Sequence, residues 1–221
     1  MQAAAGIMPA LEHVPQRETW DCGLACAEMA LRACGVRGSR VMSAPAATVW
    51  TIDLLLLLHS THPCGDYHYT TTCVGAPPAA HFELDFYKKA PGDAERVPRA
   101  FAAAAARGLA VTELAADLAR VAAELASGAA LFIALVDYRL LRCAACGGGG
   151  RAAQYQGHYV VLRGFAGGAL LYHDPARASP CEGGCAAELG AFAAAWSAAG
   201  TDCDLIRVGL GACAAGATGV L

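Results

Sequence analysis

The chain has 221 residues, of which 56% are hydrophobic and 16% are charged, which is enough to bury one substantial core. The formal net charge of −3, with Lys and Arg residues scattered along the chain, provides no basic surface and excludes nucleic acid as an expected partner. The leucine run 54–58 is too short to span a membrane and residues 1–6 lack the features of a secretory signal, so we expect a cytoplasmic protein.

The N-terminal half is expected to be mostly helical. Asp21 is a good N-cap residue for a helix over 22–33, and the leucine-rich run 51–59 predicts a second, buried helix. Alternating Tyr and Thr residues predict a strand over 66–74. The alanine-rich run 94–107 predicts a third helix, because alanine has the highest helix propensity.

The C-terminal half is expected to alternate helices with strands around one β-hairpin. The hairpin strands are 158–163 and 169–173, separated by a glycine-containing turn. Thr112 is expected to cap a helix that reaches about residue 126. The other expected elements are strands over 109–111, 131–136 and 204–208 and a helix over 186–198. Helices first and antiparallel strands later predict an α+β fold.

Cys22 is the candidate nucleophile. The first turn of a helix favours the thiolate form of a cysteine, which is the form that attacks acyl carbon. His158 is the candidate base, and Asp174, just past the paired strand, could accept a hydrogen bond from its far nitrogen. Gln16 is the candidate side-chain donor to the oxyanion. Together they predict a cysteine hydrolase with a Cys-His-Asp triad, acting on an amide, thioester or isopeptide bond of a peptide or protein.

Two families share these residue runs. Gln16, Asp21-Cys22-Gly23, 157–162 and Asp174-Pro175 resemble the bacteriocin-leader peptidase domains of ABC exporters, which implies a papain-like fold with N-terminal helices packed on an antiparallel sheet. The runs 20–26, 50–54, 155–164 and 200–204, in that order, resemble the plant and animal family named guanylyl cyclase domain-containing. The similarity spans residues 12–208. The expected organisation is therefore a flexible N-terminus over 1–11, one domain over 12–208 and a flexible tail over 209–221.

The second family's name implies a different chemistry. A guanylyl cyclase would convert GTP to cyclic GMP, with Mg²⁺ or Mn²⁺ held by paired carboxylates and basic residues on the triphosphate. Asp53, Asp85, Asp137 and Asp174 are available, but their spacing pairs none of them, and no glycine-rich phosphate loop precedes a lysine. A third function stays open, in which the papain-like fold is inactive and serves as a binding platform.

The eleven cysteines are an odd number at irregular spacings, so a disulfide framework is not expected. Cys143 and Cys146 have the spacing of zinc ligands, and Cys181 and Cys185 could complete a tetrahedral structural site. The hydrolase itself would require no cofactor. Cys26, one helical turn after Cys22, is expected to be a small buried residue.

Overall fold

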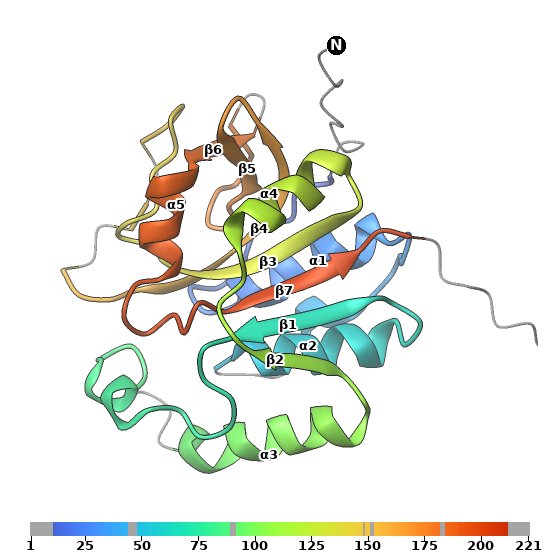
Figure 1. Cartoon of the computed structure of the whole chain (residues 1–221), viewed down its shortest axis with the longest axis vertical. Helices are drawn as coiled ribbons and strands as arrows, with labels where there is room; N and C mark the ends of the chain where they lie inside the picture. Colours follow the sequence, from blue (N-terminus) through green and yellow to red (C-terminus); the bar gives the residue numbers. More distant parts are fainter. Residues whose placement is uncertain are drawn as a thin grey trace, which may run out of the picture.

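The computed structural model describes residues 11–43, 48–88, 92–147, 149–150, 153–181 and 184–211. Its centre is one seven-stranded sheet with the strand order β2-β1-β7-β3-β4-β5-β6 (Figure 1). Neighbouring strands are antiparallel except β1 and β2, which are parallel. The strands are β1 (Tyr67–Thr71), β2 (Ala110–Glu113), β3 (Ala130–Asp137), β4 (Gly157–Ala166), β5 (Ala169–His173), β6 (Cys185–Glu188) and β7 (Leu205–Gly209).

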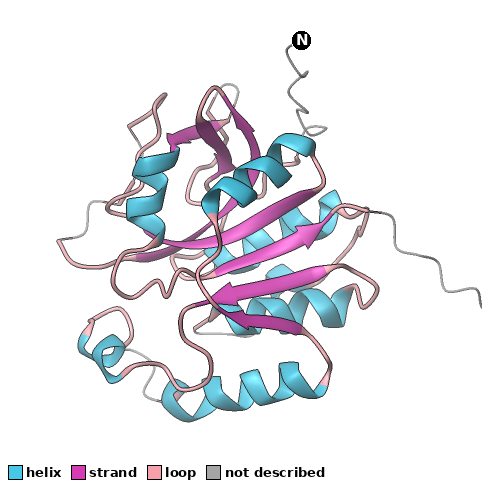
Figure 2. Ribbon diagram, viewed as in Figure 1, coloured by secondary structure: helices cyan, strands magenta, loops and turns pink. Residues whose placement is uncertain are grey.

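Helices cover both faces of the sheet (Figure 2). On one face, α1 (Cys22–Ala33) packs on β3 and β4, and α2 (Thr51–Thr61) packs on β1 and β7. On the other face, α4 (Leu118–Ser127) packs on β3 and β4, while α5 (Leu189–Trp196) lies against β3, β5 and β6. Helix α3 (Asp93–Ala106) packs on α2. The predicted α+β fold with its N-terminal helices on the sheet is confirmed.

Helix α1 begins at Cys22, as predicted, but Asp21 does not cap it. The Asp21 carboxylate instead accepts hydrogen bonds from the backbone N–H groups of Arg17 and Glu18, at 3.0–3.3 Å. Its side chain makes no capping bond to the first turn of α1. Asp21 therefore closes the preceding turn and leaves the positive end of the helix beside Cys22 without a carboxylate cap.

For two helices, the predicted start lies several residues before the observed one. Thr112 and Glu113 belong to β2, which pairs with β1, and α4 starts only after Asp117, whose carboxylate accepts the Ala119 amide at 2.9 Å. In the same way, residues 186–188 belong to β6 because they pair with β5. In both places sheet pairing outweighs local helix propensity.

The two predicted flanking segments, 1–11 and 209–221, lie almost wholly outside the described residues. Their described ends belong to the folded body, since Leu11 is buried in the core and Gly209 pairs with Ala130 at the end of β7. No helix in the described part of the chain has the length and apolar character that crossing a bilayer requires.

Candidate active site

Cys22 is the first residue of α1 and is buried, with 6% of its surface exposed. Its helix packs on β4, the strand that carries His158. Cys26, one turn further along, is fully buried, and burial raises the pKa of its thiol well above its usual value. The two thiols therefore differ in environment, because only Cys22 is at the helix start and lines a cavity.

His158 lies on β4, and Asp174 directly follows the neighbouring strand β5, as predicted. β4 pairs with β5 in a register that sets Val161 opposite His173, and Asp174 follows His173 directly. The His158 Nε2 atom lies 2.8 Å from Asp174 Oδ1. Burial alone would raise the pKa of Asp174, but hydrogen bonds from His158 and Tyr138 and the His158 charge hold it below its usual value. Asp174 is therefore a charged acceptor at neutral pH.

His158 is electrostatically coupled to Cys22. Burial alone would lower the pKa of His158, but the charge of Cys22 and hydrogen bonds with Asp174 and Cys22 raise it from 6.5 to about 9. Since Nε2 is engaged with Asp174, Nδ1 is the ring nitrogen left for Cys22. The imidazole is thus protonated at neutral pH, the state that pairs with a thiolate.

Tyr138 is a part of this site that the sequence analysis missed. Its ring lies against the His158 imidazole, with centroids 4.2 Å apart and planes at 34°. Its hydroxyl donates a hydrogen bond to Asp174 Oδ2 at 2.8 Å, opposite the oxygen that contacts His158. A tyrosine directly after a buried strand carries no motif that could have marked it.

Gln16 lies near the site, but its side chain is turned elsewhere. Its backbone N–H donates to the Pro175 carbonyl at 2.8 Å, which places it beside the turn that carries Asp174. Its side-chain Nε2 donates to the Glu18 carbonyl at 2.7 Å. Its Oε1 is buried without a hydrogen bond. The structure therefore brings the Gln16 backbone to the site without directing its amide at Cys22.

Cys22 opens onto a cavity of about 310 Å³ whose walls include five aromatic side chains. Among its described lining residues there is no Lys or Arg, and the one carboxylate, Asp93, is already bonded to Trp50 and Arg96 at 2.7 and 2.8 Å. A Cβ at Gly157 would lie 3.0 Å from the Phe86 ring, so a side chain there would require the ring to shift. The lining aromatic residues are Trp20, Trp50, Phe86, Tyr87 and Tyr159.

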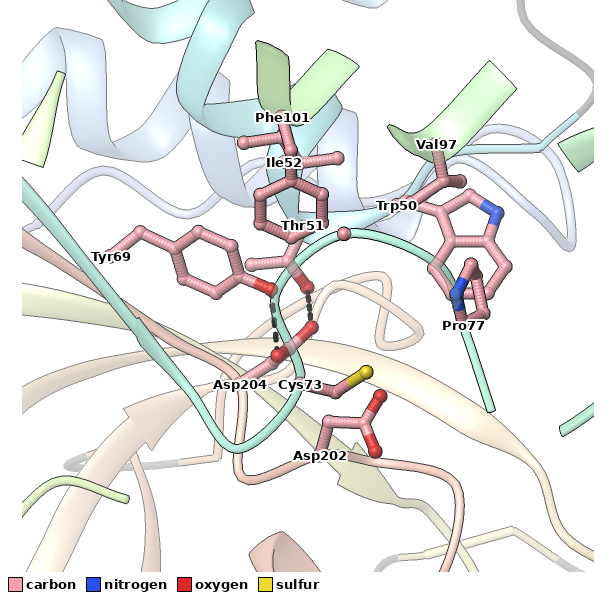
Figure 3. Close-up of a pocket in the computed structure, with 11 residues that line it drawn as sticks. Trp50, Thr51, Ile52, Tyr69, Cys73, Pro77, Val97, Phe101, Asp202 and Asp204 are labelled. Carbon is pink, nitrogen blue, oxygen red and sulfur yellow. Dashed lines mark hydrogen bonds between the residues drawn. The ribbon is translucent and has the colours of Figure 1, made fainter. Parts of the chain in front are cut away.

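A second small cavity, next to the first, surrounds the buried Asp204 (Figure 3). The Asp204 carboxylate accepts hydrogen bonds from Tyr69 at 2.7 Å and from Thr51, whose hydroxyl also lies 2.9 Å from the Tyr159 hydroxyl. Burial raises the pKa of Asp204 to about 7 despite these bonds. This network supports Tyr159, which lines the larger cavity. The network joins residues far apart in the chain, so no motif in the sequence indicated it.

The four predicted metal ligands come together. We call Cys143, Cys146, Cys181 and Cys185 the four-cysteine cluster; their sulfur atoms all lie within 4.8 Å of one another, so the cluster could bind a metal ion. The sulfurs of Cys143 and Cys181 are 3.9 Å apart, and those of Cys181 and Cys185 are 3.4 Å apart. Among the described residues it is the one group of three or more Cys, His or acidic side chains that meets this criterion.

In the described part of the chain, the candidate cyclase carboxylates belong to no group of three or more metal-ligating side chains. Asp53 is bonded to Arg96 at 2.6 Å, Asp137 to Arg139 at 2.5 Å, and Asp174 to His158. Asp85 is exposed and bonds Lys88 at 2.7 Å. Each carboxylate therefore has a local partner of its own.

The fold is that of papain-like cysteine peptidases. It is similar to the crystal structure of a putative C39-like peptidase from Bacillus anthracis, with a TM-score of 0.51 and 11% sequence identity over 90% of this chain and 94% of that chain. At this identity the likeness concerns the fold alone.

The chain belongs to the guanylylate cyclase family, whose model matches residues 11–208. It is 32% identical over 163 residues to Guanylyl cyclase 1 of Arabidopsis thaliana, a match that covers 69% of this chain and 59% of that relative. The matched region thus spans somewhat more than half of the relative's length. Both expected resemblances, to the family and to papain-like peptidases, are confirmed.

Proposed function

We propose that this protein is a cysteine hydrolase that cleaves an amide, thioester or isopeptide bond. The observation that carries the proposal is the buried pair of His158 and Asp174, 2.8 Å apart, coupled to a cysteine at the start of a helix. Burial of two charged groups costs desolvation free energy, which good hydrogen-bond geometry only partly offsets. A buried ion pair next to a cavity therefore favours a functional role.

In the proposed reaction, the Cys22 sulfur attacks the carbonyl carbon of the substrate. The carbonyl oxygen becomes an oxyanion, which backbone N–H groups in the first turn of α1 stabilise together with the positive end of the helix. His158 donates its Nδ1 proton to the leaving group as the carbon–leaving group bond breaks, and a thioester forms at Cys22. His158 then takes a proton from water as the water oxygen attacks the thioester carbon. The carbon–sulfur bond breaks, which releases the acid and restores the Cys22 sulfur. Asp174 holds the imidazole throughout.

Gln16 is the proposed second donor to the oxyanion. Its backbone is fixed to the Pro175 carbonyl, so a rotation of the side chain alone would free its amide from the Glu18 carbonyl. One amide donor of this kind is worth about 10²–10³-fold in rate.

The cavity beside Cys22 favours an apolar acyl group as substrate. Its aromatic walls bury apolar surface, and its described lining has no cation to bind a phosphate. We propose peptide or protein substrates with a bulky apolar side chain next to the scissile bond.

Trapping of the acyl-enzyme tests the proposal. A vinyl-sulfone or acyl-thioester probe with a phenylalanine side chain should form one adduct per chain, located at Cys22 by peptide mass spectrometry. His158→Gln should slow adduct formation by about 10²–10⁴-fold, because the base is lost. Absence of an adduct in the wild type would contradict the hydrolase and favour a binding platform; equal labelling of His158→Gln would contradict the role of His158.

Membership of the guanylylate cyclase family favours one alternative, synthesis of cyclic GMP from GTP. That reaction requires carboxylates that share two divalent metals and cations that bind the triphosphate. Since the candidate carboxylates each bond a local partner, we expect no cyclic GMP above a metal-free control when the protein is incubated with GTP and Mg²⁺ or Mn²⁺. Product formation that survives Cys22→Ala would establish the cyclase instead.

We also propose that the four-cysteine cluster binds a structural zinc ion. Tetrahedral zinc with Zn–S bonds of about 2.3 Å places its sulfurs about 3.8 Å apart. The two sulfur separations given above, 3.9 and 3.4 Å, lie on either side of that value.

Turn geometry also suits this metal. The Gly147 N–H donates to the Cys143 carbonyl at 2.8 Å, and the Gly184 N–H donates to the Cys181 carbonyl at 2.7 Å. Both glycines have positive φ, +67° and +90°, which turns the chain back beside each cysteine. Elemental analysis should find one zinc per chain, lost in a Cys143→Ser, Cys146→Ser double variant and kept in Cys203→Ser; zinc unchanged in the double variant would contradict the site.

A further inference from the structure

The two segments that carry the four-cysteine cluster also carry the side chains that hold His158. Tyr138 lies in the turn after β3, five residues before Cys143. Asp174 lies in the turn after β5, seven residues before Cys181. A metal ion bound by the cluster would therefore join these two segments close to the imidazole that both of them contact.

His158 depends on both segments for its position. Asp174 accepts its Nε2 at 2.8 Å, Tyr138 lies against its ring at 4.2 Å, and the Tyr138 hydroxyl bonds the second Asp174 oxygen at 2.8 Å. These three contacts form a closed triangle. A shift of either turn would break at least two of them, because hydrogen bonds weaken steeply outside their normal geometry.

Arg177 interacts electrostatically with both Asp174 and the cluster. Its Nε lies 3.6 Å from Asp174 Oδ2, and its guanidinium is within electrostatic reach of Cys146, Cys181 and Cys185. This buried Nε makes no hydrogen bond. A zinc ion with four thiolates carries a net negative charge, so the guanidinium would sit between two anions, the metal centre and the Asp174 carboxylate.

Arg163 supplies a second positive charge near the cluster. It extends from β4, and its guanidinium lies against Gly184, where an added Cβ would be 2.2 Å from Nη2. It is also within electrostatic reach of Cys185. Two arginines beside a four-thiolate centre offset its charge, as hydrogen-bonding and charged groups around metal ligands commonly do.

Without a metal, little regular structure holds the two turns together. The described parts of 138–150 and 174–184 contain no helix or strand. A backbone bond from the Ala144 N–H to the Ala186 carbonyl, at 2.9 Å, joins the cysteine turn to β6. Fixing such loops costs conformational entropy, and a metal bound by four residues of two segments supplies the crosslink that offsets it.

We infer, building on the proposed hydrolase site, that a zinc ion in the four-cysteine cluster acts as a brace that holds Tyr138 and Asp174 against His158. The metal takes no part in the reaction. Arg177 is a positioning residue that connects the metal centre to the Asp174 carboxylate. The brace makes the position and the protonation of His158 depend on zinc, although the reacting thiol, Cys22, is not a zinc ligand.

The test compares zinc-loaded and zinc-stripped protein by two measurements. Zinc is removed with a chelator under reducing conditions, its content is measured by elemental analysis, and it is then added back. The first measurement is ¹⁵N-histidine NMR, with the His158 signals assigned through His158→Gln. The second is the rate of Cys22 alkylation by iodoacetamide at several pH values. The NMR measurement does not depend on hydrolase activity, so failure of the brace and failure of the hydrolase are distinguishable.

Zinc removal should broaden or shift the His158 signals and lower its titration midpoint, while the alkylation rate at neutral pH falls about tenfold or more, and added zinc should restore both. Arg177→Gln should bind zinc but show part of the same loss, whereas Arg120→Gln, an exposed control on α4, should show none. A zinc-loaded and a stripped protein with identical His158 signals would overturn the brace, as would a chain that binds no zinc. His158 signals that respond to zinc in a protein whose Cys22 is inert would keep the brace and contradict the hydrolase.

Discussion

Replacement of Cys22 by alanine should abolish hydrolysis. The proposed reaction forms its covalent bond at this sulfur, so Cys22→Ala should lower turnover of peptide amide and thioester substrates by about 10⁴-fold or more. Alanine fits the first turn of α1 without loss of helix propensity, so the fold should be retained. Steady-state rates and thermal melting of the wild type and the variant, measured side by side, provide the check.

Cys26→Ala is the matched control for this variant. Cys26 lies one turn further along α1, is fully buried, and has a thiol whose pKa burial raises well above its usual value. Its removal should leave turnover within about threefold of the wild type, since a neutral buried thiol is a poor nucleophile. If Cys22→Ala keeps its activity, or if both variants lose it equally, Cys22 is not the nucleophile.

Asp174→Asn should slow the reaction and shift the alkaline limb of its pH–rate profile, the pH range in which kcat/KM falls as the pH rises. The pKa of His158 is about 9 because the charge of Cys22 and the contacts with Asp174 outweigh burial. The wild-type kcat/KM should therefore fall as the pH rises through about 9, where His158 loses its proton. Removing the Asp174 charge disfavours the protonated imidazole, so the limb should move to lower pH, with a rate loss of about 10²–10⁴-fold.

Two variants separate the role of Asp174 from a general effect of losing a buried acid. Asp137→Asn removes an equally buried carboxylate that bonds Arg139, and it should leave the alkaline limb near pH 9. Tyr138→Phe keeps the ring against His158 and the Asp174 charge and loses only the bond to Asp174, so it should move the limb far less than Asp174→Asn does. A limb that stays at pH 9 in Asp174→Asn would show that Asp174 does not act through His158.

The sequence predicted the parts of the site that local rules can find. The helix predicted over 22–33 is confirmed as α1, although the Asp21 side chain does not cap it. The hairpin of β4 and β5 follows from two β-rich runs with a turn between them, and its register is enough to bring Asp174 to His158. The spacing of Cys143 and Cys146 likewise predicted the first half of the four-cysteine cluster.

Local rules failed where distant segments compete for the same residues. Thr112 has good capping chemistry, but its pairing with Thr70 in β1 places it in a strand. Asp21 has the chemistry of an N-cap, but the backbone amides of Arg17 and Glu18 take its carboxylate. Gln16 stays a prediction as the oxyanion donor, because its side-chain amide is bonded to the Glu18 carbonyl and would have to rotate to reach the site.

Three features could therefore be predicted without a structure: the helix that presents Cys22, the hairpin that joins His158 to Asp174, and the cysteine pairs. These depend on contacts within one element or between neighbouring strands, whose geometry follows from residue periodicity and turn chemistry. The other contacts became visible only in the folded chain: Tyr138 covers the imidazole, Asp204, the residue before β7, supports the cavity wall, and the two cysteine pairs meet. Those contacts join residues far apart in the chain, and packing selects them only when the whole sheet is assembled.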